Sequence, residues 1–576
     1  MIYGKFLFGH LKVPRRKILS QILTPTTLWN NFDDTLDVSA VTIGVKRSKG
    51  VKFERVNFLG RETGEGRVKV FGIFASSESS PSKETVIIFP DSADSVDEAV
   101  LRLFVEKGYS ALMVDYRGEW GKVEHFTVYP KNIEYANTAK CGRYKEFVYK
   151  SADITSWYEW VAVGIYARKY VFERTGSENI AVLGIRDGGE IAWKLAAASK
   201  FSCAIPVCAV GWLAYFGVSK YRSDEQQLDS ERYRFIGGID SQAYAPFVRC
   251  PMLLLCSTNE IRFDYDRAYD TFSRINPKYA KDSIITYSVQ CDASIDDKSI
   301  EDMFMFLGKH LKGRQVVLPQ NGDISVSVDE EQNLISKVKF DNSGTIKECG
   351  IYMAEDSIDS SIREWLLCKN TKKISENEFT SYLDIYKDTS TLFVLAYATY
   401  ANGFTAWSKI AVKKLSGRFK NSCDKRSVMF SAKNGTDGFC ISDTRAVAVG
   451  GIFLADGVAL PQIVKKAKGM DGIYSEHGLT TYRMNSLRYS PSRDKVLKVD
   501  VFCDNTAEMV FMIEDNAAGE TYRYSQSILG GVWQSLVIKC KHFKNVNGTP
   551  LAEYSHNVRL CVECNEKYAI NNLMWL

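Results

Sequence analysis

The residues around position 186 have the spacing of a turn that presents a reactive side chain. Residues 184–188 read Gly-Ile-Arg-Asp-Gly, after the apolar run 180–183 and before the helix-forming segment 190–198. In one large class of acyl-transfer enzymes, a glycine-rich turn between a strand and a helix holds a nucleophilic Ser or Cys at its centre. Here the central residue is Arg186. A guanidinium group offers no acceptor and stays protonated in proteins, so it cannot attack a carbonyl carbon.

The elements that would position this turn predict a mostly parallel sheet with helices on both faces. Short apolar runs with helical segments among them are typical of strands buried on both sides. Residues 51–58 and 67–74 alternate apolar and polar instead, which predicts an antiparallel pair. An open sheet of this kind has its site at the carboxyl ends of the strands, where the Arg186 turn falls. The predicted parallel strands are 86–89, 111–114, 180–183, 204–207, 252–255 and 284–287, and the helices are 96–107, 154–173, 190–198, 265–275 and 301–311.

The pattern along the chain predicts a multidomain protein. Residues 1–40 are expected to form an arm, anchored by Trp29 and Phe32, on an α/β domain at 41–315. After about 315 the helical pattern gives way to short strands, and an Asn-Gly pair at 402–403 predicts a hairpin. We expect an immunoglobulin-like β-sandwich at 316–418 and a larger jelly-roll sandwich at 419–576.

Composition excludes several classes of function. The 576 residues carry a formal net charge of only +5, without a basic block or stripe, so nucleic acid is a poor candidate partner. We find no signal peptide and no apolar stretch long enough to span a bilayer. Fourteen cysteines without a disulfide framework suggest reduced thiols, and we therefore expect a cytoplasmic protein. The sequence predicts no cofactor and no metal site.

Residues 15–315 resemble the acetyl xylan esterase/dienelactone hydrolase group of α/β-hydrolases. Besides the turn at Arg186, the resemblance rests on an ordered set of short motifs over the whole segment. The two β domains resemble the immunoglobulin-like and carbohydrate-binding-like sandwiches that follow such hydrolases in some bacterial proteins. The motifs are Asp115-Tyr-Arg-Gly118, Tyr129-Pro130, Gly211-Trp212, Tyr244-Ala-Pro246 and residues 250–260.

The resemblance implies ester hydrolysis by a Ser or Cys nucleophile, an acid and a histidine, but the triad positions are degenerate. The nucleophile position falls on Arg186 and the acid position on Glu260, where the family usually has Asp. The base should follow the strand at 284–287, and Cys291 stands in roughly that place. The chain has only six histidines, and none lies in that loop; they are His10, His125, His310, His477, His542 and His556.

The predicted oxyanion region is degenerate as well. Backbone amides must approach a developing negative charge closely, so this loop is normally rich in glycine. Here residues 90–94 read Pro-Asp-Ser-Ala-Asp, and the carboxylates of Asp91 and Asp94 would repel an oxyanion. Members of a catalytic triad act as a unit, so the loss of nucleophile, base and oxyanion glycines together predicts an inactive enzyme.

Several alternatives remain open for these residues. A shifted turn would make Asp187 a carboxylate nucleophile, although no base histidine would accompany it. Arg186 could instead pair with Asp91, Asp94 or Glu260, or it could bind an anionic ligand together with Asp91 and Glu260. Cys291 could be a nucleophile, but a lone cysteine is more often a small buried apolar residue.

We therefore predict a catalytically inactive pseudo-esterase that acts by binding or assembly. The ligand would be a glycan, and the partner a second copy of the chain or a paralogous hydrolase. One alternative is a carbohydrate esterase or deacetylase with a rebuilt site, and another is a self-assembling structural subunit. Four aromatic residues of the last sandwich could stack on sugar rings, although such residues more often fill sandwich cores; they are Tyr522, Tyr524, Trp533 and Trp575.

Overall fold

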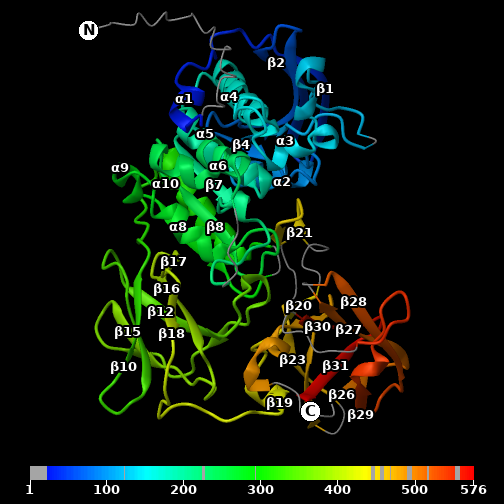
Figure 1. Ribbon diagram of the computed structural model, residues 1–576. Coiled ribbons are helices and arrows are strands. Elements are labelled where there is room, and N and C mark those ends of the chain that lie inside the picture. Colours follow the sequence, from blue (N-terminus) through cyan, green and yellow to red (C-terminus); the bar gives the residue numbers. More distant parts are fainter. Residues whose placement is uncertain are drawn as a thin grey trace, which may run out of the picture.

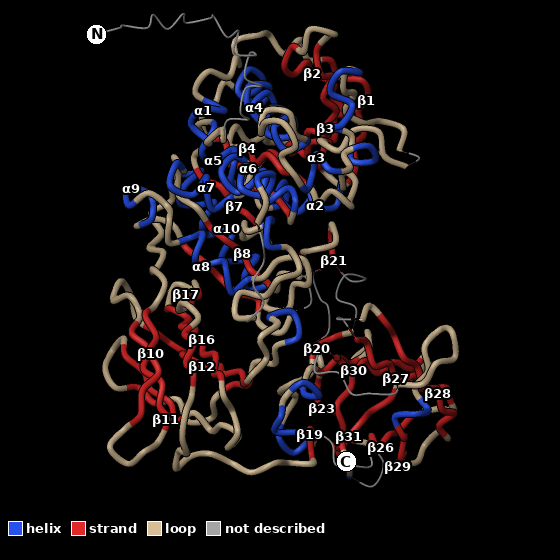
Figure 2. Tube along the Cα trace, in the orientation of Figure 1, coloured by secondary structure: helices blue, strands red, loops and turns tan. Residues whose placement is uncertain are grey.

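The protein consists of an α/β domain and two β-sandwiches (Figure 1). Helices are concentrated in the upper lobe, and the two lower lobes are built from strands (Figure 2). The computed structural model describes residues 22–121, 123–222, 228–291, 294–442, 448–454, 460–466, 469–489, 496–515, 518–551 and 558–576.

The α/β domain is built on a nine-stranded sheet in the order β1-β2-β3-β5-β4-β6-β7-β8-β9. The sheet is antiparallel from β1 to β5 and parallel from there on. This order, with β4 and β5 exchanged, is that of the α/β-hydrolase fold, and it confirms the predicted fold class. The strands are β1 Val41–Ser48, β2 Val51–Glu62, β3 Arg67–Ser77, β4 Thr85–Phe89, β5 Ser110–Asp115, β6 Ile180–Ile185, β7 Cys203–Val207, β8 Leu253–Ser257 and β9 Ile284–Ser288.

Helices cover both faces of this sheet, so every residue of the strands β4 to β9 is buried. One core contains Trp157, Trp160 and Trp193 from α4 and α5, and the other contains Leu101 and Phe306 from α2 and α10. Within the described ranges, no helix is long and apolar enough to cross a membrane. The α-helices are α1 Pro25–Trp29, α2 Glu98–Glu106, α3 Arg143–Glu146, α4 Ser156–Thr175, α5 Asp187–Ala198, α6 Ser230–Gly238, α7 Ser241–Tyr244, α8 Ala268–Phe272, α9 Pro277–Ala280 and α10 Asp297–Lys312.

Short 3-10 turns complete the helical segments. In the α/β domain they are η1 Lys131–Ala136, η2 Thr138–Lys140, η3 Leu213–Tyr215, η4 Ala245–Phe247 and η5 Tyr265–Arg267. In the β domains they are η6 Ser360–Ile362, η7 Ala432–Asn434, η10 Arg483–Asn485, η11 Leu487–Tyr489 and η12 Cys540–His542.

The first β domain packs two antiparallel sheets over one apolar core. The predicted Asn-Gly hairpin is confirmed, since β16 and β17 pair across it. One sheet consists of β10 Asp323–Val328, β11 Leu334–Lys339, β15 Glu378–Tyr382 and β14 Lys372–Lys373. The other consists of β13 Leu366–Leu367, β12 Ile346–Glu355, β16 Thr391–Tyr400, β17 Thr405–Trp407 and β18 Ala411–Lys414.

The second β domain is also a two-sheet sandwich with a single core. One sheet consists of β23 Gln462–Lys465, β24 Asp471–Tyr474, β31 Tyr568–Trp575, β26 Val496–Cys503, β29 Gln534–Lys539 and β19 Val428–Phe430. The other consists of β20 Cys440–Ile441, β25 Leu479–Thr481, β30 Val558–Cys564, β27 Ala507–Asp515 and β28 Glu520–Ile528.

A small hairpin from the C-terminal part of the chain packs on the α/β domain rather than on either sandwich. It is formed by β21 Ala448–Val449 and β22 Phe453–Leu454. Ile452 and Phe453 are fully buried in the core on the α2 and α10 side of the nine-stranded sheet. The backbone N–H of Ile295 donates to the carbonyl of Ile452 at 2.7 Å. The hairpin therefore ties the C-terminal part of the chain to the loop after β9.

All three domains meet at residues 355–365. Arg363 is fully buried, and its guanidinium forms two hydrogen bonds of 2.7 Å with Asp266 of the α/β domain. The next residue, Glu364, accepts a 2.7 Å hydrogen bond from Arg483 of the second β domain. Paired buried charges of this kind fix the geometry of a junction, because separating them would leave an uncompensated charge.

The N-terminal arm is described from residue 22 onward. The indole N–H of Trp29 donates to the Tyr244 hydroxyl at 3.1 Å, and its ring stacks on Tyr158 at 4.8 Å. Phe32 contacts the same Tyr158 ring edge-on at 6.2 Å. Trp29 and Phe32 therefore attach the described part of the arm to the α/β domain; residues 1–21 of the predicted arm lie outside the described residues.

Candidate functional site

The turn between β6 and α5 has the geometry of a nucleophile elbow. Arg186 lies at its centre with φ 49° and ψ −109°, a backbone conformation that residues other than glycine rarely adopt. Its backbone N–H donates to the carbonyl of Val207 at 2.8 Å, and Glu190 N–H donates to the Arg186 carbonyl at 2.9 Å. Strain of this kind persists where the surrounding structure determines it. The sharp turn is therefore present, with an arginine at its centre.

The glycines of this turn are required by close packing. A Cβ on Gly184 would lie 1.9 Å from the carbonyl oxygen of Gly188. A Cβ on Gly188 would lie 2.2 Å from the carbonyl oxygen of Phe89, at the end of the neighbouring strand β4. Only glycine fits such close backbone approaches. Gly184 is thus required by the tightness of the turn itself, and Gly188 is required by its contact with the end of β4.

Arg186 points into the domain and pairs with two carboxylates. Its Nε donates to Oε2 of Glu260 at 3.1 Å, and its Nη1 lies 3.6 Å from Oδ2 of Asp91. Arg186 is 4% exposed, and both carboxylates are 2% exposed. Three residues predicted as site residues are therefore brought together, one each from the loops after β6, β8 and β4.

Two further cations, which the sequence analysis did not identify, complete the cluster. Arg262 contacts Asp91 at 2.5 Å and Asp187 at 3.2 Å. Lys145 contacts Asp187 at 2.6 Å. Arg262 stands two residues after Glu260 and could have been considered on that ground, whereas nothing in the sequence near Lys145 indicates its position.

The cluster is electrically balanced and largely buried. Among the described residues, it consists of three carboxylates and three cations, namely Asp91, Asp187, Glu260, Lys145, Arg186 and Arg262. Burial opposes the charged form of Arg186, but Glu260, followed by Cys208 and Asp91, outweighs burial and raises its pKa. Burial also opposes ionisation of Asp187, but Lys145 and Arg262 outweigh it and lower the pKa of that carboxyl. The side chains at the elbow are therefore held as mutually neutralised ions.

Asp187 is engaged on several sides, which bears on its possible role as a shifted nucleophile. Its Oδ2 accepts hydrogen bonds from Lys145, from Arg262 and from the hydroxyl of Ser92. A carboxylate whose charge is shared among such donors is a weak nucleophile, and a general base is needed to complete hydrolysis.

The loop that would supply oxyanion amides is occupied by its own side chain. The backbone N–H of Ser92 donates to Oδ1 of Asp91 at 2.7 Å. An oxyanion hole requires amide groups aimed at the empty space where negative charge develops. Asp91 holds a negative charge at this amide instead. Asp94, which the sequence analysis also considered as a partner for Arg186, lies beside Gly451 of the C-terminal hairpin.

Cys291, which the sequence places roughly at the base position, follows β9 and is partly exposed. Its carbonyl accepts a hydrogen bond from the Ser257 hydroxyl. Burial raises the pKa of the Cys291 thiol well above 9.0, and the nearby Asp296 acts in the same direction. A thiol must be deprotonated to act as a nucleophile or base, so this environment does not activate it.

The four histidines in the described residues have other neighbours. His125 lies 5.4 Å from the ring of Phe71, and His310 lies 4.5 Å from the ring of Phe306. His542 stacks on Tyr524 of the second β domain, and His477 donates its backbone N–H to Ser475. None of these four is placed at the elbow. His10 and His556 lie outside the described residues.

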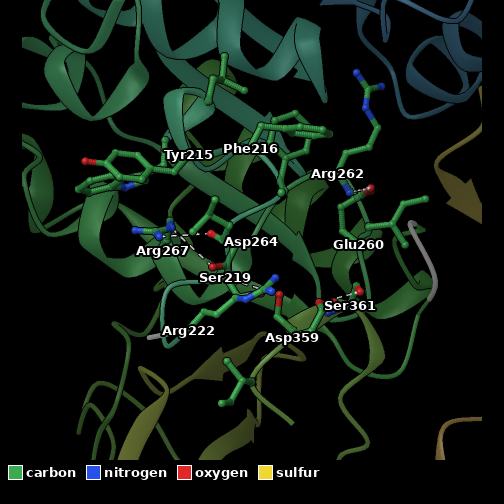
Figure 3. A pocket seen from close by; sticks show the side chains of 18 of the residues that line it. Tyr215, Phe216, Ser219, Arg222, Glu260, Arg262, Asp264, Arg267, Asp359 and Ser361 are labelled. Atoms are coloured by element: carbon green, nitrogen blue, oxygen red, sulfur yellow. Dashed lines mark hydrogen bonds and ion pairs between the residues drawn. The ribbon is translucent and has the colours of Figure 1, made fainter. Parts of the chain in front are cut away.

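A cleft of about 900 Å³ opens beside the cluster, where the three domains meet (Figure 3). One wall comes from the α/β domain, mainly the loops at 211–222 and 260–267. The opposite wall comes from residues 358–361 of the first β domain and from the β27–β28 hairpin of the second. Glu260 belongs both to the elbow cluster and to the cleft wall, so the two features are contiguous. No sequence pattern predicted this cleft, because its walls are far apart along the chain.

The aromatic residues considered as sugar platforms lie elsewhere in the second β domain. Trp575 is 1% exposed and belongs to the sandwich core. Tyr522 and Tyr524 are partly buried against the same core. Trp533 packs against Phe502 at 5.5 Å. Trp575 therefore fills the core of the sandwich. The aromatic side chains that line the cleft come from the α/β domain.

Solved structures of several esterases resemble the N-terminal half of the chain. An acetyl xylan esterase from Paenibacillus sp. R4 is 16% identical, with a TM-score of 0.38, and the match covers 50% of this chain and 92% of that protein. Acetyl xylan esterase 1 from Thermoanaerobacterium sp. JW/SL YS485 is 14% identical, with a TM-score of 0.34 and coverages of 49% and 90%. The Pyrococcus furiosus esterase Pf2001 is 16% identical, with a TM-score of 0.33 and coverages of 49% and 99%.

No protein-family model matches the sequence, and no curated protein matches it significantly. The assignment of the α/β-hydrolase fold rests on the strand order of the nine-stranded sheet and on the elbow between β6 and α5.

Proposed function

We propose that the α/β-hydrolase domain of this chain does not hydrolyse esters and that the protein acts by binding. The supporting observation is the charge-balanced cluster in which Arg186, at the centre of the elbow, is held by Asp91 and Glu260. Ester hydrolysis through the triad mechanism needs an oxygen or sulfur nucleophile at that point and a base beside it. A permanently protonated guanidinium supplies neither.

The cleft between the three domains is the proposed binding site, for a glycan or for a segment of a partner protein. Its volume of about 900 Å³ is that of a site for a ligand of several rings or residues. Aromatic and charged side chains line it together, as in sites that combine stacking with hydrogen bonds. A second copy of the chain or a paralogous hydrolase is the partner proposed for assembly.

An esterase assay tests the first half of this proposal. The wild-type protein should release p-nitrophenol from p-nitrophenyl acetate at the rate of a protein-free or heat-denatured control. Arg186→Ser restores a hydroxyl at the elbow but no histidine, so it should also remain at the control rate. Saturable turnover by the wild type that is lost in Asp187→Asn or Cys291→Ala would contradict the proposal and would favour a carbohydrate esterase with a rebuilt site.

A binding assay and a sizing column test the second half. A glycan that occupies the cleft should raise the melting temperature in proportion to the logarithm of its concentration above Kd. A large homogeneous species on the column, without a thermal shift for any sugar, would instead favour the self-assembling structural subunit.

A further inference from the structure

The cleft between the three domains is acidic, although the protein as a whole is basic. Among its described lining residues, six are Asp or Glu and three are Arg. The complete chain has a formal net charge of +5, so this surplus of negative charge is local. A cleft lined by one sign of charge focuses its field and concentrates ions of the opposite sign.

The charges on the α/β wall largely neutralise one another. Arg262 and Glu260 belong to the balanced elbow cluster. Arg267 lies 3.5 Å from Asp264, and its guanidinium stacks over the ring of Tyr215 at 5.0 Å. Arg222, the third arginine of the lining, also has an interaction within the protein. The three arginines are therefore committed to contacts within the chain, so they do little to offset the carboxylates of the opposite wall.

The β-domain wall retains negative charge. Among its described lining residues there is no Lys or Arg. Asp359 accepts hydrogen bonds from the Ser361 hydroxyl at 2.8 Å and from the Ser361 amide, and Glu520 accepts one from the Asn545 amide at 2.6 Å. Serine and asparagine are neutral donors, so they stabilise these carboxylates without cancelling their charge. Glu514 differs, because Arg559 pairs with it at 2.5 Å.

Apolar side chains are exposed on the α/β side of the same cleft. Phe216 is 63% exposed and Ile261 is 53% exposed, and both line the cleft. Figure 3 shows Phe216 and Arg262 on one side of the cleft, and Asp359, Ser361 and Arg222 on the other side. An aromatic face and a branched aliphatic group offer contact area to a ring or to a methylene stem. The occupant should therefore combine an apolar body with positive charge.

We propose that this cleft binds an amine-bearing ligand, with its ammonium groups against Asp359 and Glu520 and its apolar part on Phe216. This inference rests on the proposed function, because it names the ligand chemistry of the same cleft. An amino sugar and a lysine side chain both present this chemistry, and the experiment distinguishes the two sources.

Isothermal titration calorimetry with three probes tests the inference on the full-length protein. The probes are the trisaccharide of glucosamine, the trisaccharide of N-acetylglucosamine and tetralysine. The two sugars share a backbone, but only the first is cationic. We expect the glucosamine trisaccharide to bind at least tenfold more tightly than its N-acetylated counterpart in 50 mM salt, with the difference falling as salt is raised. Binding of tetralysine as tight as that of the sugar would identify a protein segment as the source of the amine.

Variants locate the binding. Asp359→Asn combined with Glu520→Gln should weaken the cationic probes about tenfold and change the N-acetylated sugar less than twofold. Phe216→Ala should weaken all probes that bind. Glu376→Gln is the matched control, because Glu376 is exposed between β14 and β15, away from the cleft lining. This control should bind like the wild type.

Two results would overturn the inference. If both sugars bind equally, the charge argument is wrong, whereas glycan binding by the protein stands. If the cationic probes bind the Asp359 and Glu520 variant as tightly as the wild type, or if no probe binds at all, the cleft is not an amine site. The esterase assay remains the separate test of whether the elbow is inactive.

Discussion

Replacing Arg186 by methionine is the sharpest test of the elbow cluster. Methionine fills a similar length and adopts positive φ with the same difficulty as arginine, so the variant removes the charge and leaves the backbone strain unchanged. Glu260 would lose its 3.1 Å partner Arg186 and, among its contacts with the described residues, would keep the 3.1 Å hydrogen bond from the Arg262 backbone N–H. Asp91 would keep Arg262 at 2.5 Å. One buried carboxylate is thus left without its cation.

The expected loss of stability follows from the fact that Glu260 loses its cation whereas Asp91 keeps Arg262. Removing one partner of a buried ion pair destabilises a protein by about 3–5 kcal/mol. Because the Arg262 amide still contacts Glu260, we expect a loss near the lower end, about 3 kcal/mol. The double variant Arg186→Met with Glu260→Gln should recover part of that loss, since no orphaned charge remains. Arg186→Lys keeps the charge and should lose less than Arg186→Met.

Urea unfolding followed by tryptophan fluorescence measures these differences. The three tryptophans of the buried core on α4 and α5 report on the α/β domain. A chain of several domains does not unfold in one step, so the comparison uses the midpoint of that domain's transition. Wild-type stability in Arg186→Met, within about 0.5 kcal/mol, would refute the argument that Arg186 neutralises a buried carboxylate.

Three further predictions concern the elbow, the pH response and the domain junction. Gly188→Ala places a Cβ 2.2 Å from the Phe89 carbonyl oxygen, so a thermal melt should show a loss of more than about 2 kcal/mol; an unchanged melt would contradict the packing argument. Burial raises the pKa of Asp302 from 3.8 to about 7, so its stabilising contribution is complete below pH 4 and is lost as pH rises through 7. Asp302→Asn should therefore make the urea midpoint depend less on pH between pH 4 and 8. If the midpoints of variant and wild type change with pH in the same way, Asp302 is not the source of the pH dependence. Arg363→Met leaves Asp266 buried without its cation and should speed limited proteolysis between the α/β domain and the first β domain; unchanged cleavage would mean that other contacts hold the junction.

The sequence determined the fold class and the main anomaly of this protein. Buried parallel strands are recognisable because they are short, apolar on both faces and separated by helices, and these are local properties of the chain. The elbow was recognisable because its tight backbone packing requires glycine at positions 184 and 188, and these two glycines flank Arg186 in the sequence. The type of a residue and its place in a local turn can both be seen without any knowledge of distant contacts.

Only the tertiary structure decided what Arg186 does and where a ligand could bind. Asp187 meets Lys145 across 42 residues and Arg262 across 75, and the pairing of Arg186 with Glu260 spans 74. The cleft has walls from three domains, which are joined by the buried pairs Arg363–Asp266 and Glu364–Arg483. The sequence gives the charge and polarity of each residue. Whether two charges neutralise each other depends on the distance between them, and packing between segments far apart in the sequence sets that distance. For that reason the missing nucleophile and a pairing of Arg186 with Asp91 or Glu260 could be inferred from the sequence, whereas the parts of Lys145 and Arg262 in the cluster and the acidic cleft could not.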